Sequence, residues 1–220
     1  MFKLTKQWQI RFFFWIAIAL LKIFMPKPFN FMAFNVFLAY IPVEIGFQLP
    51  RFNDRRALAF WGCLIIWLLF YPNTPYVMTD LFHLSWLSPH TSINGLLKSD
   101  PHIWLIFAIM VLCAISCLFF GLLSLDQVSH QLTELICPHH PKIKFWWIIF
   151  FSFISSIGIY IGRFLRLHSI YLFFTPSWFF RQLLSIWSIN MLKFTLILTC
   201  LQILSYWILK TVQNTKYKGG

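Results

Sequence analysis

The stretch YPNTPYVMTDLFHL, residues 71–84, directly follows an uninterrupted apolar run at residues 57–70. Its two prolines lack a backbone N–H and fix φ, so they predict the end of the helix that the apolar run forms. Asn73 or Thr74 is then expected to cap a new helix that has Pro75 in its first turn. The stretch therefore predicts a short helix that begins where a membrane span ends.

The predicted short helix is amphipathic. On a helical wheel one arc of about 100° is polar and the opposite arc is apolar. The polar arc holds Tyr76, Thr79, Asp80 and His83, and the apolar arc holds Val77, Met78, Leu81, Phe82 and Leu84. We expect this helix to lie at the membrane interface, where a carboxylate and an imidazole are costly unless they are used or paired.

The composition identifies a multi-pass membrane protein. The chain is 59% hydrophobic and 11% charged, with 27 Phe and 11 Trp, whereas soluble domains average about 25% charged residues. The net charge is +12, but the basic residues cluster beside apolar runs. In that position they set topology and attract anionic lipid headgroups. We therefore expect the lipid bilayer as partner, and no nucleic acid.

A membrane-spanning helix needs about 20 apolar residues, and six segments qualify. These are approximately residues 8–25, 29–49, 56–71, 102–125, 143–165 and 187–209. The first resembles a signal peptide but lacks a small-x-small cleavage site, so we interpret it as an uncleaved span. The prediction is an all-α polytopic transmembrane helix bundle of about six spans and one interfacial amphipathic helix, forming a single transmembrane domain over residues 1–220.

The distribution of lysine and arginine predicts the orientation, because cytoplasmic segments carry an excess of both. With the N-terminus inside, eleven of the 18 basic residues lie on the inner side and seven on the outer side. We therefore expect both termini in the cytoplasm. The outer set is Lys22, Lys27, Lys98, Arg163, Arg166, Arg181 and Lys193.

The fifth predicted span carries a polar stripe that should face the bundle interior. The stripe consists of Ser152, Ser155, Ser156, Gly162, Arg163 and Arg166. Gly158 and Gly162 also form a Gly-x-x-x-Gly pair, which allows close approach of helices.

Two outer elements together define the candidate site. The residues are Asn73, Tyr76, Thr79, Asp80, His83, Arg163 and Arg166. In one interpretation the arginines grip a phosphate or carboxylate, and Asp80 orients His83 or acts as a base. In the other, Asp80 forms an ion pair with an arginine and pins the short helix to the bundle. Two arginines for one carboxylate leave a surplus positive charge, so an anion-binding site remains the alternative to a simple ion pair.

The second predicted span contains the intramembrane polar residues Asn35 and Glu44, with Pro42 between them. Pro42 is expected to kink the helix. For Glu44 we expect a salt bridge to the cluster Arg51, Arg55 and Arg56; a proton or cation relay is the alternative.

The sequence predicts no metal site and no cofactor. Cys137, His139 and His140 lack the further ligands that zinc needs, and there is no glycine loop or dinucleotide fingerprint. The five cysteines are odd in number and mostly lie within apolar runs, which argues against a disulfide framework.

Residues 71–84 resemble the hallmark of a bacterial membrane-protein family, domain of unknown function 1361. The hallmark runs Pro-Asn-Ala-Pro-Tyr, then Thr-Asp, then His-Leu. Two further blocks, residues 162–166 (GRFLR) and 35–42 (NVFLAYIP), are similar to family elements and occur in family order. Thr74 replaces the usual alanine, and the acidic residue expected after Arg166 is absent. The resemblance implies a multi-pass protein of the bacterial plasma membrane and no defined activity.

Three function classes follow. The leading hypothesis is a non-enzymatic membrane protein that binds an anionic small molecule or lipid headgroup at its outer face, or acts as a transport component. The first alternative is a membrane enzyme that acts on a lipid-linked substrate through Asp80 and His83. The second is a structural or assembly protein. A transporter would need a polar path lined by Asn35 and Glu44.

Overall fold

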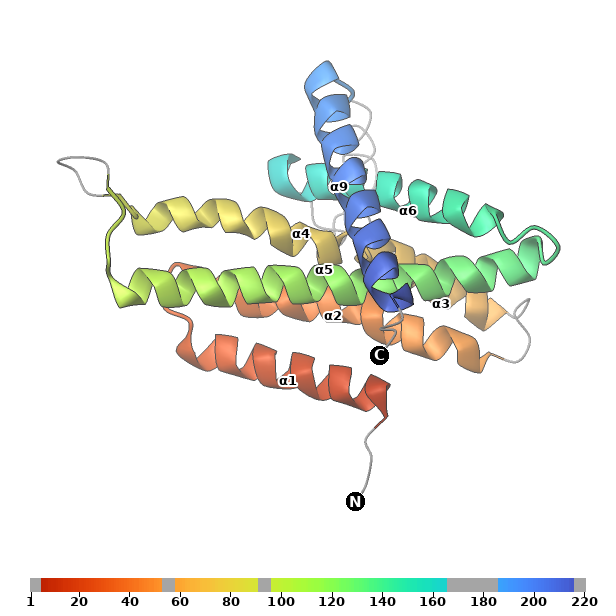
Figure 1. Cartoon of the computed structure of the whole chain (residues 1–220), viewed down its shortest axis with the longest axis horizontal. Coiled ribbons are helices and arrows are strands. Elements are labelled where there is room, and N and C mark those ends of the chain that lie inside the picture. Colours follow the sequence, from red (N-terminus) through yellow and green to blue (C-terminus); the bar gives the residue numbers. More distant parts are fainter. Residues whose placement is uncertain (1–4, 53–57, 91–95, 166–185, 216–220) are drawn as a thin grey trace, which may run out of the picture.

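The computed structural model describes residues 5–52, 58–90, 96–165 and 186–215 (Figure 1). Within these ranges the chain is helical, with an isolated antiparallel bridge between His90 and Leu97. The helices are α1 (Lys6–Phe24), α2 (Met32–Gln48), α3 (Leu58–Phe70), α4 (Asn73–Thr79), α5 (Pro101–Ile136), α6 (Ile143–Tyr160) and α9 (Ile189–Asn214). Shorter turns flank them: η1 (Phe29–Phe31), η2 (Leu49–Arg51), η3 (Asp80–Leu87) and the π-helical η4 (Ile161–Leu165).

Six helical segments in the described ranges are long and apolar enough to cross a membrane, which confirms the all-α fold with six spans. They are Lys6–Phe24, Phe29–Arg51, Leu58–Leu87, Pro101–Ile136, Ile143–Leu165 and Ile189–Asn214. All except α9 follow the long axis of the molecule in Figure 1, whereas α9 crosses them steeply. We call the end where α1 and α6 begin the Lys142 end, and the opposite end the Trp86 end.

The third span differs from the prediction. The chain breaks after Phe70, but α4 and η3 continue it, and Leu58–Leu87 is one apolar segment. α4 packs against α2 and α5, with Thr74 and Val77 fully buried, so the predicted short helix is packed into the bundle. The chain continues because proline removes single hydrogen bonds without stopping the ladder: the N–H of Tyr76 still donates to the carbonyl of Pro72 at 3.1 Å.

The predicted cap of the short helix is also wrong. Pro72 occupies the cap position, and no side chain bonds to the first turn of α4. Asn73 Nδ2 instead donates to the carbonyl of Phe70 at 2.9 Å, and Thr74 Oγ1 to that of Tyr71 at 3.0 Å. Both side chains thus satisfy carbonyls at the end of α3, where the helix itself offers no partner.

α5 is longer than predicted. It has 36 residues and ends at Ile136, beyond the predicted end at residue 125. At about 1.5 Å per residue it measures about 54 Å, against about 30 Å for the hydrocarbon core of a bilayer. The extension is more polar than the span before it, and its Gln131 and Thr133 are buried.

Glycines let α6 and α5 approach the break between α3 and α4. A Cβ on Gly158 would lie 2.8 Å from Cγ of Pro72, and a Cβ on Gly121 of α5 would collide with the Thr74 side chain. The predicted close approach at the glycine pair therefore occurs, and its tight member is Gly158, since a Cβ on Gly162 would lie 3.5 Å from Tyr76. The break between α3 and α4 is therefore packed closely against α6 at Pro72 and against α5 at Thr74.

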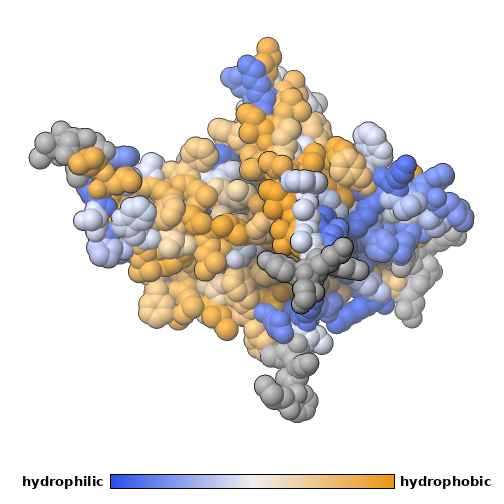
Figure 2. Space-filling view, in the orientation of Figure 1, coloured by the Kyte–Doolittle hydropathy of each residue, from blue (hydrophilic) through white to orange (hydrophobic). Residues whose placement is uncertain are grey.

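The predicted polar stripe on α6 faces the interior. Ser152, Ser155 and Ser156 are buried, and α9 bonds to the hydroxyl of Ser156 and to the backbone carbonyl of Ser152. Gln202 Nε2 donates to Ser156 Oγ at 2.9 Å, and Thr199 Oγ1 to the same atom at 3.1 Å. Such bonds join helices where lipid offers no alternative partner. The rest of the surface is largely apolar, and Figure 2 shows hydrophilic residues gathered toward the ends of the bundle, most clearly the Lys142 end.

Candidate functional site

The centre of the candidate site is the carboxylate of Asp80, the first residue of η3. Its side chain is 1% exposed. Arg163 Nη2 on η4 donates to Oδ1 at 2.8 Å, and Asn35 Nδ2 on α2 donates to Oδ2 at 2.7 Å. Both oxygens are therefore occupied, and one carboxylate links three separate segments of the bundle.

Arg163 is held at several points. Its Nε donates to Thr79 Oγ1 at 3.2 Å, and Nη2 contacts the same hydroxyl. Its guanidinium lies 4.4 Å from the centre of the Tyr76 ring, a distance at which a cation is attracted to an aromatic face. The Thr79 hydroxyl in turn donates to the carbonyl of Tyr76 at 2.6 Å. The arginine is thus fixed in one orientation while 20% of its side chain stays exposed.

His83 lies beside this pair. Its Nδ1 is 3.0 Å from the backbone carbonyl of Asp80 and 3.8 Å from Asp80 Oδ1. The imidazole packs between Phe31 and Trp86, with ring centres 4.9 and 4.3 Å away. Since 21% of the side chain is exposed, His83 and Arg163 both reach the surface from the same buried oxygen.

The structure brings together most of the predicted site. Tyr76, Thr79, Asp80, His83 and Arg163 form one cluster. Asn35, predicted with Glu44 as an intramembrane polar residue, belongs to this cluster as well. Asn73 does not, because its side chain bonds to the end of α3. Arg166 lies outside the described residues. The predicted surplus of positive charge, which depends on Arg166, therefore stays a prediction.

The comparisons with known proteins identify the family. The model of a family described as "Protein of unknown function (DUF1361)" matches residues 34–205. The chain belongs to this family. No curated protein and no solved structure matched it. The matched range contains every residue of the Asp80 cluster, so this family member carries the whole cluster within the shared region.

Glu44 belongs to a separate network at the Lys142 end. Arg11 of α1 donates two hydrogen bonds to its carboxylate, from Nε to Oε2 at 2.8 Å and from Nη2 to Oε1 at 2.9 Å. Tyr40 donates at 2.9 Å, and Gln48 also contacts the carboxylate. Among the described residues Glu44 pairs with Arg11 from the neighbouring helix; of the predicted partner cluster, Arg55 and Arg56 lie outside the described residues. Asn35 and Glu44 thus line no common path among the described residues.

The sequence analysis missed a third network, centred on Asp126 of α5. Lys144 Nζ on α6 lies 2.7 Å from Oδ1, and Lys210 Nζ on α9 lies 2.8 Å from Oδ2. Tyr206 donates to Oδ1 at 2.5 Å. An available signal was the position of Asp126 directly after an apolar run, with Lys142 and Lys144 at the start of the next predicted span; Lys210 lies 84 residues later and had no such signal.

Potential metal ligands do not gather within the described ranges: no group of three His, Cys, Asp or Glu is close enough to hold an ion. His130 and Glu134 form a surface pair at 3.2 Å. All five cysteines are free, with Cys113 and Cys117 buried.

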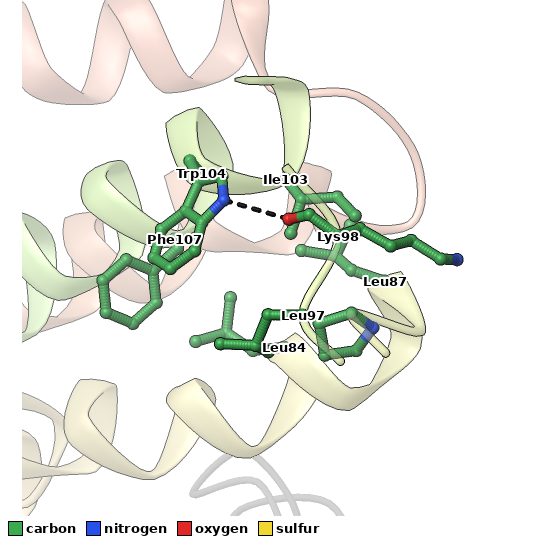
Figure 3. Close-up of a pocket in the computed structure, with 8 residues that line it drawn as sticks. Leu84, Leu87, Leu97, Lys98, Ile103, Trp104 and Phe107 are labelled. Carbon is green, nitrogen blue, oxygen red and sulfur yellow. Dashed lines mark hydrogen bonds between the residues drawn. The ribbon is translucent and has the colours of Figure 1, made fainter. Parts of the chain in front are cut away.

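Two cavities among the described residues are apolar and separate from the Asp80 cluster. One, of about 260 Å³, lies at the Trp86 end between η3 and the start of α5 (Figure 3). Trp104 Nε1 donates to the carbonyl of Lys98 at 3.1 Å at its edge. The other, of about 420 Å³, is a groove between α1 and α5. Neither includes Asp80 or Arg163, and both suit hydrocarbon better than an ion.

Proposed function

We propose that this chain is a non-enzymatic membrane protein that binds the anionic group of a lipid or small molecule at the Trp86 end, through Arg163 and His83. The observation that carries the proposal is an oriented arginine that remains partly exposed. Asp80 and Thr79 hold the Nε and Nη2 side of the guanidinium. Its Nη1 takes part in none of the hydrogen bonds found among the described residues, so that edge can receive an oxygen of a phosphate or carboxylate.

The charge balance of the cluster limits the ligand. Asp80 compensates the charge of Arg163, so hydrogen bonds rather than net charge would supply most of the attraction. A halide offers no directed acceptors, whereas a phosphate or carboxylate can accept from Arg163 and His83 together. We therefore expect selectivity for oxyanions.

The same geometry gives little support to an enzyme that uses Asp80 as acid or base. A catalytic group must come within about 2.6–3.2 Å of the proton it transfers, and Asp80 is 1% exposed with both oxygens bonded. Asp80 fits better as the positioning residue of Arg163. A transport role finds no support in a shared path, since Asn35 and Glu44 belong to different networks.

A structural role is the second candidate, because the Asp80–Arg163 pair and Asn35 tie α2, α4 and α6 together. In that case the cluster pins the bundle and binds nothing. Membrane location is part of either proposal: we place the protein in the bacterial plasma membrane, with the Lys142 end in the cytoplasm. The described basic residues Lys6, Arg11, Arg51, Lys142, Lys144 and Lys210 favour this orientation.

Native mass spectrometry of the detergent-purified chain tests the proposal. Arg163→Lys keeps a charge beside Asp80 but lacks the planar fork, and Arg51→Gln is the control because Arg51 is exposed at the other end. We expect an oxyanion or lipid adduct on the wild type and on Arg51→Gln, and its loss from Arg163→Lys. No adduct on the folded wild type would overturn the binding proposal in favour of the structural one.

A further inference from the structure

We propose a second binding site, at the Lys142 end, in which Lys144 and Lys210 hold the phosphate of an anionic phospholipid. The two ammonium groups converge on opposite oxygens of Asp126, at 2.7 and 2.8 Å. The site joins the start of α6 to the end of α9 and shares no residue with the Asp80 cluster.

The charges of this site do not cancel. Two lysines face one carboxylate, and the hydroxyl of Tyr206 adds a donor to the same carboxylate. This leaves one positive charge in excess, unlike the balanced pair at Asp80. The side chains of Lys144 and Lys210 are 27% and 30% exposed, so they can reach a ligand while Asp126 holds their separation.

Aromatic residues place this cluster at the level of lipid headgroups. Trp146 follows Lys144 by two residues and is 67% exposed, and Trp207 precedes Lys210 by three residues and is 61% exposed. Exposed indoles beside basic residues are typical of the membrane–water interface, where the ring lies among headgroups. The phosphate that lies at this level is that of a phospholipid.

The surface beside the lysines suits acyl chains. On α9, Trp207 lies one turn before Lys210 and is exposed, and Leu196, three turns before Trp207, is exposed as well. Residues three or four apart share a helix face, so α9 presents apolar surface on the side of its lysine. A lipid bound by its phosphate at Lys144 and Lys210 can therefore lay an acyl chain along this face.

Native mass spectrometry of the full chain tests this site with three probes: phosphatidylglycerol, phosphatidylcholine and inorganic phosphate. The variants are Lys144→Gln and Lys210→Gln, and the control is Lys193→Gln, an exposed lysine near the other end of α9. A lysine near a membrane surface contributes about 1 kcal/mol of attraction, so each site variant should weaken phosphatidylglycerol binding about fivefold. The control should bind like the wild type.

The outcomes separate the possible ligands. Preference for phosphatidylglycerol over phosphatidylcholine, lost in both site variants, would support the proposal. Equal binding by wild type and site variants would overturn it. Inorganic phosphate bound through the same lysines without preference for the anionic lipid would also overturn it and assign the site to free phosphate. Lys144→Arg guards against misfolding, since it keeps the charge and should retain the lipid. The same comparison in an Arg163→Lys background, which lacks the adduct proposed for the Asp80 cluster, reports on the Lys144 and Lys210 site alone and keeps the two proposals independent.

Discussion

At the scale of single residues, Asp80 and Arg163 are unequal partners in one ion pair. Asp80 is 1% exposed, whereas 20% of the Arg163 side chain reaches the surface. Removing the arginine leaves a buried carboxylate without its counter-charge, and removing the carboxylate leaves an arginine that can turn toward solvent. The two variants should therefore differ in cost although they break the same bond.

We expect Arg163→Gln to lower the free energy of unfolding by about 3–5 kcal/mol, the range for a buried charge that loses its partner. Asp80→Asn should cost less, because asparagine can still accept from Asn35 or Arg163. In the double variant the two costs should not add, since the interaction is lost only once. Reversible unfolding in mixed detergent micelles measures this cycle, and additive costs would show that the pair does not stabilise the bundle.

At the scale of elements, the break between α3 and α4 shows where sequence reasoning succeeded and failed. The two prolines located the break and the polar arc located the cluster. The sequence did not predict what covers the polar face, because amphipathicity shows only that a helix has two faces. Here the polar face meets Asn35 and Arg163 from two other helices.

The same limit explains the missed partners. Glu44 is bonded by Arg11, 33 residues earlier, and Asp126 by Lys210, 84 residues later. Which helices are neighbours decides these pairs, and hydropathy patterns contain no information on helix order in space. The serine stripe on α6 was assigned to the interior correctly because a polar face on an apolar helix has few other places to go.

The break itself should be sensitive to volume. Gly158→Ala would place a Cβ 2.8 Å from Cγ of Pro72, a rigid ring. Gly62→Ala is the matched control, because a Cβ there meets nothing within 4 Å. Overpacking costs about 1–3 kcal/mol, whereas alanine in an open helical position gains up to about 1 kcal/mol over glycine. Unfolding in detergent should thus give Gly62→Ala a higher free energy of unfolding than the wild type, and Gly158→Ala a lower one. Equal free energies for Gly158→Ala and the wild type would mean that α6 moves away from Pro72 at no cost.

At the scale of the whole molecule, three carboxylates at separate places join the helices of an otherwise apolar bundle. Glu44 ties α1 to α2, Asp80 ties α2 and α4 to α6, and Asp126 ties α5 to α6 and α9. Packing between apolar helices gains little in lipid because the lipid tails are equally apolar, so directed bonds contribute more to which helices associate. α9 shows this most clearly, since Thr199 and Gln202 bond to Ser156 of α6 while many of its apolar residues face outward.

The attachment of α9 should therefore depend on Asp126. Asp126→Asn removes the charge that holds Lys210 and leaves one oxygen where the carboxylate offered two to Lys144, Lys210 and Tyr206, while Ser156 and Gln202 remain to hold the middle of the helix. We expect backbone amides at residues 203–214 to exchange hydrogen faster by about tenfold, because losing about 1.4 kcal/mol of local stability raises an opening equilibrium by that factor. Glu134→Gln is the control, as Glu134 lies on the same helix in a half-exposed pair with His130. Hydrogen exchange read by mass spectrometry distinguishes the variants: faster exchange in both would indicate a general effect on α5, and unchanged exchange in Asp126→Asn would show that the serine and glutamine contacts alone hold α9.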